Sequence, residues 1–336
     1  MADRELAKLV TSVSQGKVPI GNETVAEFLN RWVEHLESIG RSPVYVRESR
    51  YKIDTIVNPE LGRLRLSKLT ARHLDLLYRK MTDRGLKPRT VRTVHAVLSA
   101  ALHQAEKWDL VDRPVTTRAT PPTVHAEQVV APTPAEVRKL LDQAETVDPA
   151  LAALLLIAAL TGARRGELCA LRWSDLNWQA GVLTIARSVY EMEGGGWAEK
   201  STKTHQSRRV GLDELGLAVL RRHRGNVERL AAELELAIAV DAFIFSQSPV
   251  GLEPYRPNHV TQFTRRMAKA AGVKTHVHGL RHFSATQLIA GGYDVRTVAG
   301  RLGHADASVT LRVYSHVLPE RDREAAAALG RVLALP

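Results

Sequence analysis

Residues 150–168 read ALAALLLIAALTGARRGEL, and this stretch decides the fold of the second half of the chain. Its first eleven residues are all apolar, which is too short a run to span a bilayer and predicts a helix buried on every side. Gly162 and Gly166 then allow a tight turn and close approach of another backbone. Arg164 and Glu167 have helical i, i+3 spacing, so we expect the carboxylate to hold the guanidinium in one orientation.

The flanking sequence indicates a mainly α domain with a small antiparallel β-sheet. A cap, a proline and a capping-box glutamate predict that a helix begins after Thr133. Short strands are expected at 182–189, 208–212 and 242–245, the first two joined across the glycine turn at 194–196. From about Pro257 onward the apolar spacing is helical again.

The first part of the chain predicts a separate all-α domain. Apolar residues at helical spacing, with caps and terminal glycines, predict helices at 22–40, 42–56, 70–85 and 88–108. Many prolines and little apolar periodicity then indicate an extended linker. We therefore divide the chain into a short helix within 1–20, the all-α domain 21–112, the Pro-rich linker 113–131, a mixed α/β domain 132–318 and a tail 319–336.

Positive charge is concentrated in the all-α domain. The whole chain has a formal charge of +11, and residues 41–92 alone hold 14 basic and 5 acidic side chains. Such a basic face is typical of a protein that binds the phosphate backbone of a nucleic acid, although an arginine-rich solvated surface is an alternative. The candidate DNA-binding residues are Arg41, Arg47, Arg50, Lys52, Lys87, Arg89 and Arg92.

Composition excludes several other classes of protein. Hydrophobic residues make up 44% of the chain, which is too many for a globally disordered protein. The one cysteine, Cys169, excludes a disulfide scaffold and a cysteine-based zinc site, and its apolar context predicts an inert thiol. No signal-peptide pattern is present, so we expect a cytoplasmic protein with no membrane partner.

A set of cationic side chains and one tyrosine lies downstream of Arg164. His278 and Arg281 share a helix face, residues 302–304 read Leu-Gly-His, Tyr314 follows, and Lys203 lies in the predicted hairpin. This set suits phosphoryl transfer to a tyrosine. Planar arginines neutralise a phosphodiester, cations and a base activate the weakly acidic phenol, and a lysine can protonate the leaving alkoxide.

In this order, the motifs resemble the tyrosine recombinases and, within them, the phage-type integrases. The resemblance covers residues 22–320 and implies an all-α core-DNA-binding domain followed by a mixed α/β catalytic domain. The motifs are Thr-Gly-x-Arg-x-Gly-Glu from Thr161, Lys-Thr-x-x-Ser-x-Arg from Lys203, His-x-Leu-Arg from His278, Leu-Gly-His from Leu302, and the final Tyr314.

The resemblance implies a role for each of these residues. Arg164 and Arg281 clamp the scissile phosphate, Glu167 supports Arg164, and His304 donates a hydrogen bond to the phosphate. The remaining three are two proton-transfer residues and the nucleophile. Lys203 is the general acid on the 5′-oxygen, His278 assists proton transfer from the tyrosine, and Tyr314 forms the 3′-phosphotyrosyl bond. No metal or other cofactor is implied, because the phosphotyrosyl bond replaces the broken phosphodiester bond until a second 5′-hydroxyl attacks.

The resemblance also implies partners. These are double-stranded DNA at attachment and core sites, three further copies of the chain in a homotetramer on DNA, and an excisionase and a host DNA-bending factor as candidate accessory proteins. The tail 319–336 is expected to pack on a neighbouring protomer. Residues 1–20 resemble only the last helix of an arm-binding module, so we expect either that arm-site binding is absent or that this chain starts inside a longer one.

Other interpretations of the same residues remain. His278, His282 and His304 could bind a metal, although no His-Glu-x-x-His accompanies them and Arg281 would lie beside the cation. Within the same chemistry, the chain could be a Xer-like chromosome-resolving recombinase or a type IB topoisomerase. It could also be a DNA-binding relative that has lost catalysis, although a protein that only binds DNA has no need of Tyr314.

Overall fold

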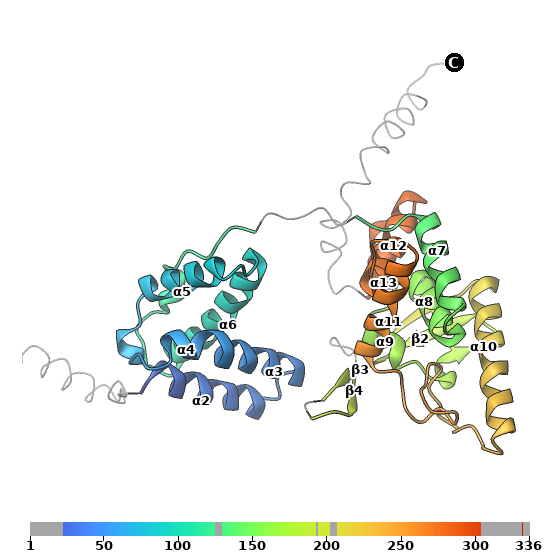
Figure 1. The fold of residues 1–336 in the computed structure, drawn as a ribbon, viewed down its shortest axis with the longest axis horizontal. Coiled ribbons are helices and arrows are strands. Elements are labelled where there is room, and N and C mark those ends of the chain that lie inside the picture. Colours follow the sequence, from blue (N-terminus) through green and yellow to red (C-terminus); the bar gives the residue numbers. More distant parts are fainter. Residues whose placement is uncertain (1–22, 125–129, 193, 202–206, 304–330, 332–336) are drawn as a thin grey trace, which may run out of the picture. The chain divides into compact units, whose positions relative to one another are not determined.

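The computed structural model describes residues 23–124, 130–192, 194–201, 207–303 and 331. The chain divides into two compact units, residues 1–126 and 127–336, each with its own hydrophobic core (Figure 1). The helix expected within 1–20 and the role expected of the tail 319–336 fall outside the described residues. Among the described helices, none is both long and apolar enough to cross a membrane.

The first unit is built from helices, as the sequence predicts. Thr24 and Glu27, which have capping-box spacing in the sequence, form this motif at the start of the first helix, and the Thr24 N–H donates to Glu27 Oε2 at 2.6 Å. Apolar faces of the helices meet around Trp32 and Phe28, which are fully buried. The helices are α2 (Val25–Ser38), α3 (Pro43–Lys52), a π-helical turn (Ile53–Val57), α4 (Asn58–Leu61), a 3₁₀ turn (Leu66–Lys68), α5 (Ala71–Asp83) and α6 (Pro88–Lys107).

The beginning of the expected linker packs on this first unit. A 3₁₀ turn (Val115–Thr117) places Val115 against the helical core, together with Ala119. The Thr120 N–H also donates to the Asp75 carboxylate of α5 at 2.7 Å. Residues 113–120 are therefore held by apolar contacts and a hydrogen bond that proline content alone does not reveal.

The second unit is organised around helix α8 (Pro149–Thr161), the apolar run from which the sequence analysis begins. Most of its side chains are buried because α7, α9, α10, α11 and α12 all contact it (Figure 1). The predicted all-round burial is thus confirmed. The other helices are α7 (Pro134–Glu145), α9 (Arg165–Cys169), a 3₁₀ turn (Trp173–Asp175), α10 (Glu214–Glu233), α11 (Pro257–Ala270), α12 (Val277–Ala290) and α13 (Val295–Leu302).

The strands differ from the sequence prediction in their partners. The expected strand 182–189 is interrupted at Ala186, which separates β2 (Val182–Ile185) from β3 (Arg187–Glu191). Strand β2 pairs antiparallel with β1 (Leu176–Asn177) and β5 (Arg208–Gly211), whereas β3 pairs with β4 (Trp197–Ser201) across the glycine turn. The chain therefore forms a three-stranded sheet and a two-stranded ribbon, β3–β4, among the described residues.

The strand expected at 242–245 does not form. Phe243 makes one isolated bridge with Arg172, while Ile244 and Phe245 are buried in the core of the second unit. A short apolar run is equally compatible with a strand and with another kind of buried segment, so hydrophobicity alone misassigned it.

Two helix ends meet at left-handed glycines. Helix α8 is followed by Gly162 (φ 64°) and α13 by Gly303 (φ 70°). A Cβ added to Gly162 would overlap Leu302 Cδ2, and one added to Gly303 would lie 2.8 Å from Arg208 Nη1. Only glycine permits both the backbone conformation and this close approach.

This close approach predicts different costs for two matched substitutions in the second unit. Gly272 also has a left-handed conformation (φ 68°), but a Cβ there would meet no atom within 4 Å. Gly272→Ala should therefore lower the free energy of unfolding by about 1 kcal/mol, from backbone strain alone. Gly162→Ala should cost about 1–3 kcal/mol more, because Leu302 must move. Urea unfolding of both variants at neutral pH measures this difference, and equal losses would contradict it.

Candidate active site

Arg164 and Glu167 form a hydrogen-bonded pair at the start of helix α9. The Glu167 carboxylate accepts from the Arg164 backbone N–H at 2.8 Å and from Arg164 Nη1 at 3.0 Å. This confirms the contact expected from their i, i+3 spacing, and the carboxylate also lies at a helix N-terminus, where negative charge is favoured. Glu167 is buried, whereas nearly half of the Arg164 side chain is exposed. The pair therefore presents a fixed guanidinium to solvent.

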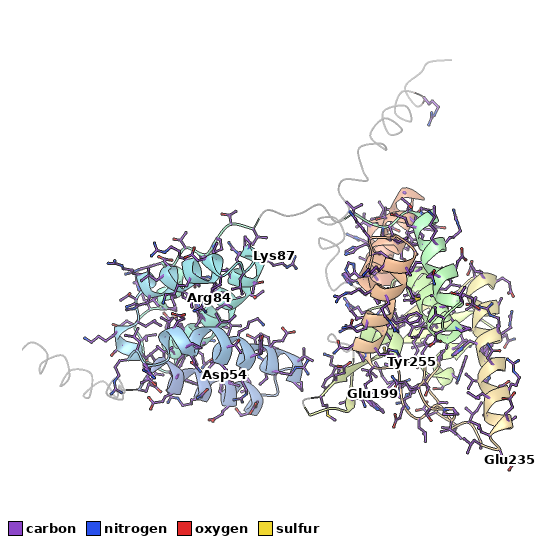
Figure 2. The ribbon with its side chains drawn as sticks, in the orientation of Figure 1. Asp54, Arg84, Lys87, Glu199, Glu235 and Tyr255 are labelled. Carbon is purple, nitrogen blue, oxygen red and sulfur yellow. The ribbon has the colours of Figure 1, made fainter. Side chains whose placement is uncertain are left out.

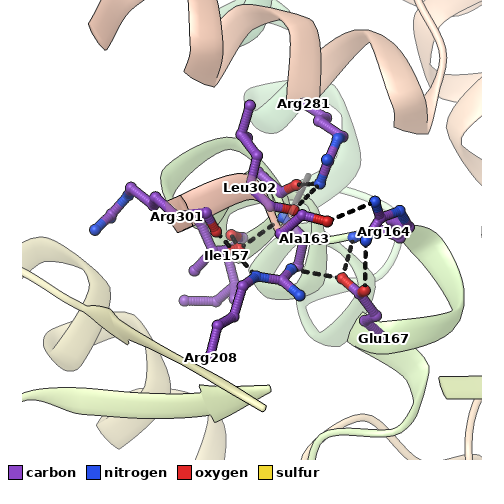
Figure 3. Close-up of polar contacts among 11 residues, drawn as sticks. Ile157, Ala163, Arg164, Glu167, Arg208, Arg281, Arg301 and Leu302 are labelled. Atoms are coloured by element: carbon purple, nitrogen blue, oxygen red, sulfur yellow. Dashed lines mark hydrogen bonds and ion pairs between the residues drawn. The ribbon is translucent and has the colours of Figure 1, made fainter. Parts of the chain in front are cut away.

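A second arginine, Arg208 of strand β5, reaches the same carboxylate. Its Nη2 donates to Glu167 Oε2 at 2.6 Å, and its Nε donates to the carbonyl of Arg301 at 2.9 Å (Figure 3). The sequence analysis missed Arg208, because the hairpin motif assigns the arginine to position 209. Strand alternation could have found it, since Arg208 shares a side of β5 with the buried Val210, whereas Arg209 is exposed.

The buried carboxyl of Glu167 is ionised because of these partners. Burial acts to raise its pKa, but the hydrogen bond and charge of Arg208 and the contacts with Arg164 outweigh burial. The net effect is a pKa below the usual value for glutamic acid. A charged Glu167 thus holds two guanidiniums from different elements.

Arg281 and Arg164 bind the backbone at the two helix ends. Arg281 of α12 is buried, and its Nη1 donates to the carbonyls of Gly162 and Leu302, both at 2.6 Å. Arg164 Nη2 donates to the carbonyl of Gly303 at 2.9 Å. Figure 3 shows both guanidiniums beside this junction of α8 and α13. The structure therefore brings the two arginines of the predicted phosphate clamp to adjacent carbonyls of one chain segment.

A further arginine, Arg301 of α13, completes this network. Its Nη2 donates to the carbonyls of Leu160 and Gly211, each at 3.0 Å. These bonds tie α13 to the last turn of α8 and to strand β5. The sequence analysis did not single out Arg301, and its position near a helix C-terminus, where cations are favoured, is the available signal.

His278 lies one turn before Arg281 on α12 and belongs to the same site. Desolvation by the surrounding chain lowers the pKa of its imidazole, and electrostatic interactions with Arg281, His276 and Arg164 lower that pKa further. His278 is therefore neutral near pH 7 and can accept a proton, although it keeps an exposed surface. Its ring packs edge-on against His282, with the centroids 4.7 Å apart.

Three predicted site residues, Lys203, His304 and Tyr314, lie outside the described residues. The structure thus brings together Arg164, Glu167, His278 and Arg281, and the chain leaves the described part of the site at Gly303, the residue before His304 in the sequence. Within the described residues, no group of three His, Cys, Asp or Glu side chains is arranged to hold a metal ion.

The predicted DNA-binding residues lie on the first unit, near the beginning of α6 and along α3. Arg41, Arg47, Lys87, Arg89 and Arg92 are exposed. The other two form ion pairs at the surface: Arg50 with Glu37 at 3.0 Å, and Lys52 with Glu48 at 3.6 Å. These two cations are partly neutralised by the protein itself.

Cys169 is buried in α9, as its apolar context predicts. Burial raises the pKa of its thiol to about 12. A thiol with this pKa is protonated at neutral pH and is a poor nucleophile.

Comparison with known proteins identifies the family. Residues 132–321 match the phage integrase family. The "Tyrosine recombinase XerC-like" protein of Caldanaerobacter subterraneus subsp. tengcongensis is 24% identical over 326 residues, covering 91% of this chain and 83% of that protein. The "ICEBs1 integrase" of Bacillus subtilis is also 24% identical, over 297 residues, covering 88% of this chain and 80% of the relative.

The fold is also similar to that of a solved integrase structure. The Tn1549 transposon integrase, solved in complex with transposon right end DNA, superposes with a TM-score of 0.77 at 20% identity and covers 93% of this chain and 100% of that one. Since the family match spans more than half of the sequence, the chain belongs to the phage integrase family, whose members are tyrosine recombinases that break and rejoin DNA.

The charge of Glu167 predicts a pH-dependent contribution to stability. Because the pKa of its carboxyl is lower in the folded chain, its stabilising effect is complete above about pH 4.5 and is lost as the pH falls through the folded pKa. Glu167→Gln should therefore lower the free energy of unfolding by about 3 kcal/mol at pH 7, because two guanidiniums lose their counter-charge. Denaturant unfolding from pH 7 to pH 3 should show this difference shrinking below about pH 4.5.

The control for this measurement is Glu228→Gln. Glu228 pairs with Arg224 on the exposed surface of α10, an i, i+4 contact at 2.7 Å. Its loss should change stability by less than about 0.5 kcal/mol at any pH. A loss of the same size for both glutamates would contradict the special role of Glu167.

Proposed function

We propose that this protein is a site-specific recombinase that integrates or excises a mobile DNA element through a 3′-phosphotyrosyl intermediate. One observation carries the proposal: Arg164 and Arg281, more than a hundred residues apart in the sequence, meet at the junction of α8 and α13, and His278 lies close enough to both for their charges to lower its pKa. The family membership supplies the reaction class. The XerC-like protein and the ICEBs1 integrase are equally identical to this chain, so identity does not choose between a chromosome-resolving recombinase and an integrase. The Pro-rich linker favours the integrase.

The arginines are suited to neutralise a phosphodiester. A nucleophile is repelled by the anionic phosphate until its non-bridging oxygens are stabilised, and planar guanidiniums do this in fixed geometry. Arg164 is held by Glu167 and Gly303 yet remains partly exposed, so it can receive a phosphate oxygen. Arg281 is buried, which strengthens the field of its charge. These groups need no rearrangement as negative charge develops.

The proposed reaction balances its protons through three residues. The Tyr314 oxygen attacks the phosphorus and forms a new P–O bond, while the bond from phosphorus to the 5′-oxygen breaks. His278, neutral at pH 7, accepts the phenolic proton, and Lys203 donates a proton to the departing 5′-oxygen. His304 donates a hydrogen bond to the phosphate. Attack by a 5′-hydroxyl from a second strand reverses these steps and rejoins the DNA.

The proposed partners are double-stranded DNA and three further copies of the chain in a tetramer, with an excisionase and a DNA-bending protein as candidate accessory factors. We also propose that the domain boundaries given above separate a core-DNA-binding region from the catalytic region. The exposed cations of the first unit support DNA binding there. The proposed place of action is the cytoplasm of a bacterial host, at the nucleoid.

Tyr314→Phe should abolish covalent capture of DNA and leave DNA binding intact, because it removes one hydroxyl. The assay uses a nicked suicide duplex carrying the core site, obtained by selecting bound fragments from the DNA that flanks the gene. Denaturing gels then separate the covalent protein–DNA adduct from free DNA. The matched control is Tyr293→Phe, since Tyr293 is exposed and should form the adduct at the wild-type rate. An adduct formed by Tyr314→Phe would place the nucleophile elsewhere.

Binding to DNA should weaken steeply with salt, because phosphate contacts release counterions. A plot of log K against log salt concentration should have a slope of about −0.9 for each neutralised phosphate. Arg89→Ala removes an exposed cation and should reduce the steepness of this slope by about one unit. Arg50→Ala should change it less, because Glu37 already pairs with Arg50. Fluorescence anisotropy across a salt series measures both, and a nearly flat wild-type slope would contradict the proposed interface.

A further inference from the structure

The ribbon β3–β4 is the described element that leads to Lys203. Its last residue, Ser201, precedes Lys203 by two positions. Among the described residues its two strands pair only with each other, and an isolated two-stranded ribbon is marginally stable. Its position must therefore come from contacts with the rest of the second unit.

Strand β3 has such contacts with helix α9. A Cβ added to Gly166 of α9 would lie 2.6 Å from both Ser188 Oγ and the Val189 carbonyl, and Val189 is buried. The backbone of β3 is thus pressed against the helix that begins beside Arg164. This contact fixes the inner strand of the ribbon.

Strand β4 is fixed through the side chain of Arg172. Arg172 Nη2 donates to the Glu199 carboxylate of β4 at 2.8 Å, and Nη1 donates to the Asp241 carboxylate. The face of the same guanidinium lies over the Phe243 ring, 4.3 Å from its centroid, and Trp197 of β4 meets that ring edge-on. One planar cation therefore joins β4 to two other segments, which the point charge of a lysine could not do.

A second ion pair holds the open end of the ribbon, from which the chain continues toward Lys203. Arg187, the first residue of β3, lies opposite Ser201 in the antiparallel register. Its Nη2 donates to both oxygens of Asp175, at 2.8 and 2.7 Å. The Asp175 carboxylate also accepts from the backbone N–H of Arg172 at 2.9 Å. The Arg187 pair thus attaches the open end of the ribbon to the turn at residues 172–175, and the Arg172 pair attaches the middle of β4 to the same turn.

We propose that Arg172 and Glu199 are positioning residues for Lys203: they fix strand β4, whose last residue lies two positions before Lys203, so that the general acid reaches the 5′-oxygen. This inference rests on the proposed function, in which Lys203 is the proton donor. Neither Arg172 nor Glu199 touches the DNA in this proposal. Their contribution to the reaction passes entirely through the position of the ribbon, in contrast to Arg164, which contacts the phosphate.

A substrate with sulfur in place of the bridging 5′-oxygen separates these two kinds of effect. When the P–S bond breaks, the thiolate leaves without needing a proton, so a defect in proton donation disappears. A defect in phosphate binding persists. The experiment uses the full chain with the oxygen and the sulfur form of one suicide duplex, and single-turnover rates of adduct formation are measured.

Glu199→Ala should slow cleavage of the oxygen substrate by at least about tenfold and restore a near-wild-type rate on the sulfur substrate. Glu199→Gln, which keeps an acceptor oxygen for Arg172, should lie between Glu199→Ala and the wild type. Arg164→Ala should be slow on both substrates. Glu228→Ala, in an exposed pair on α10, should be normal on both. Thermal unfolding and DNA binding of each variant are measured alongside.

The outcomes distinguish this inference from the proposed function. If Lys203→Ala is rescued by sulfur but Glu199→Ala is equally slow on both substrates, or shows no defect, then the positioning role is refuted and the general acid stands. If Lys203→Ala is not rescued, then Lys203 is not the proton donor, and the positioning role fails with it. If Glu199→Ala does not fold, Glu199→Gln decides between the same alternatives.

Discussion

The unsatisfied carbonyls at the ends of α8 and α13 are the constraint on which the site depends. The last turn of a helix leaves carbonyl groups without intrahelical donors, and buried carbonyls must find donors elsewhere. Here the donors are arginines: Arg281 serves Gly162 and Leu302, Arg164 serves Gly303, and Arg301 serves Leu160. The same hydrogen bonds therefore hold the two helix ends together and place the cations of the site.

This arrangement of carbonyl groups and arginines also explains how several positive charges are held close together. The carbonyl ends of the two helices carry partial negative charge, and Glu167 supplies a full one. Arg164 and Arg208 share that carboxylate from opposite elements, so each guanidinium is fixed before any ligand arrives. The remaining excess of positive charge contributes to the lowered pKa of His278. An anionic substrate would thus meet a site that is already organised, and a neutral imidazole beside it.

The ribbon β3–β4 is attached in a different way. The arginine network lies among buried helix ends, whereas the ribbon adds no strand to the three-stranded sheet and is held by ion pairs of partly exposed side chains. Strand β3 packs closely against α9, so the position of the ribbon is fixed relative to Arg164, the residue before α9. The arginines proposed to bind phosphate are therefore held by buried contacts, whereas the strand that leads to Lys203 is held by ion pairs that single side-chain substitutions can remove.

The sequence by itself determined the elements whose signals are local. Capping at Thr24 and Thr133, the buried run that became α8 and the Arg164–Glu167 pair depend on residues a few positions apart, and all three appear in the structure. The motif order was also enough to identify the family, because it depends on residue types and not on contacts.

Only the tertiary structure decided which segments meet. The break at Ala186, the pairing of β2 with β5 and the non-strand path of 242–245 depend on long-range packing that local hydrophobicity does not encode. The sequence did not reveal Arg208 and Arg301, because their hydrogen-bond partners are 41 to 141 residues away along the chain. These partners are the Glu167 carboxylate and the carbonyls of Leu160 and Gly211. Such contacts arise from the approach of two helix ends in space, which no spacing along the chain displays.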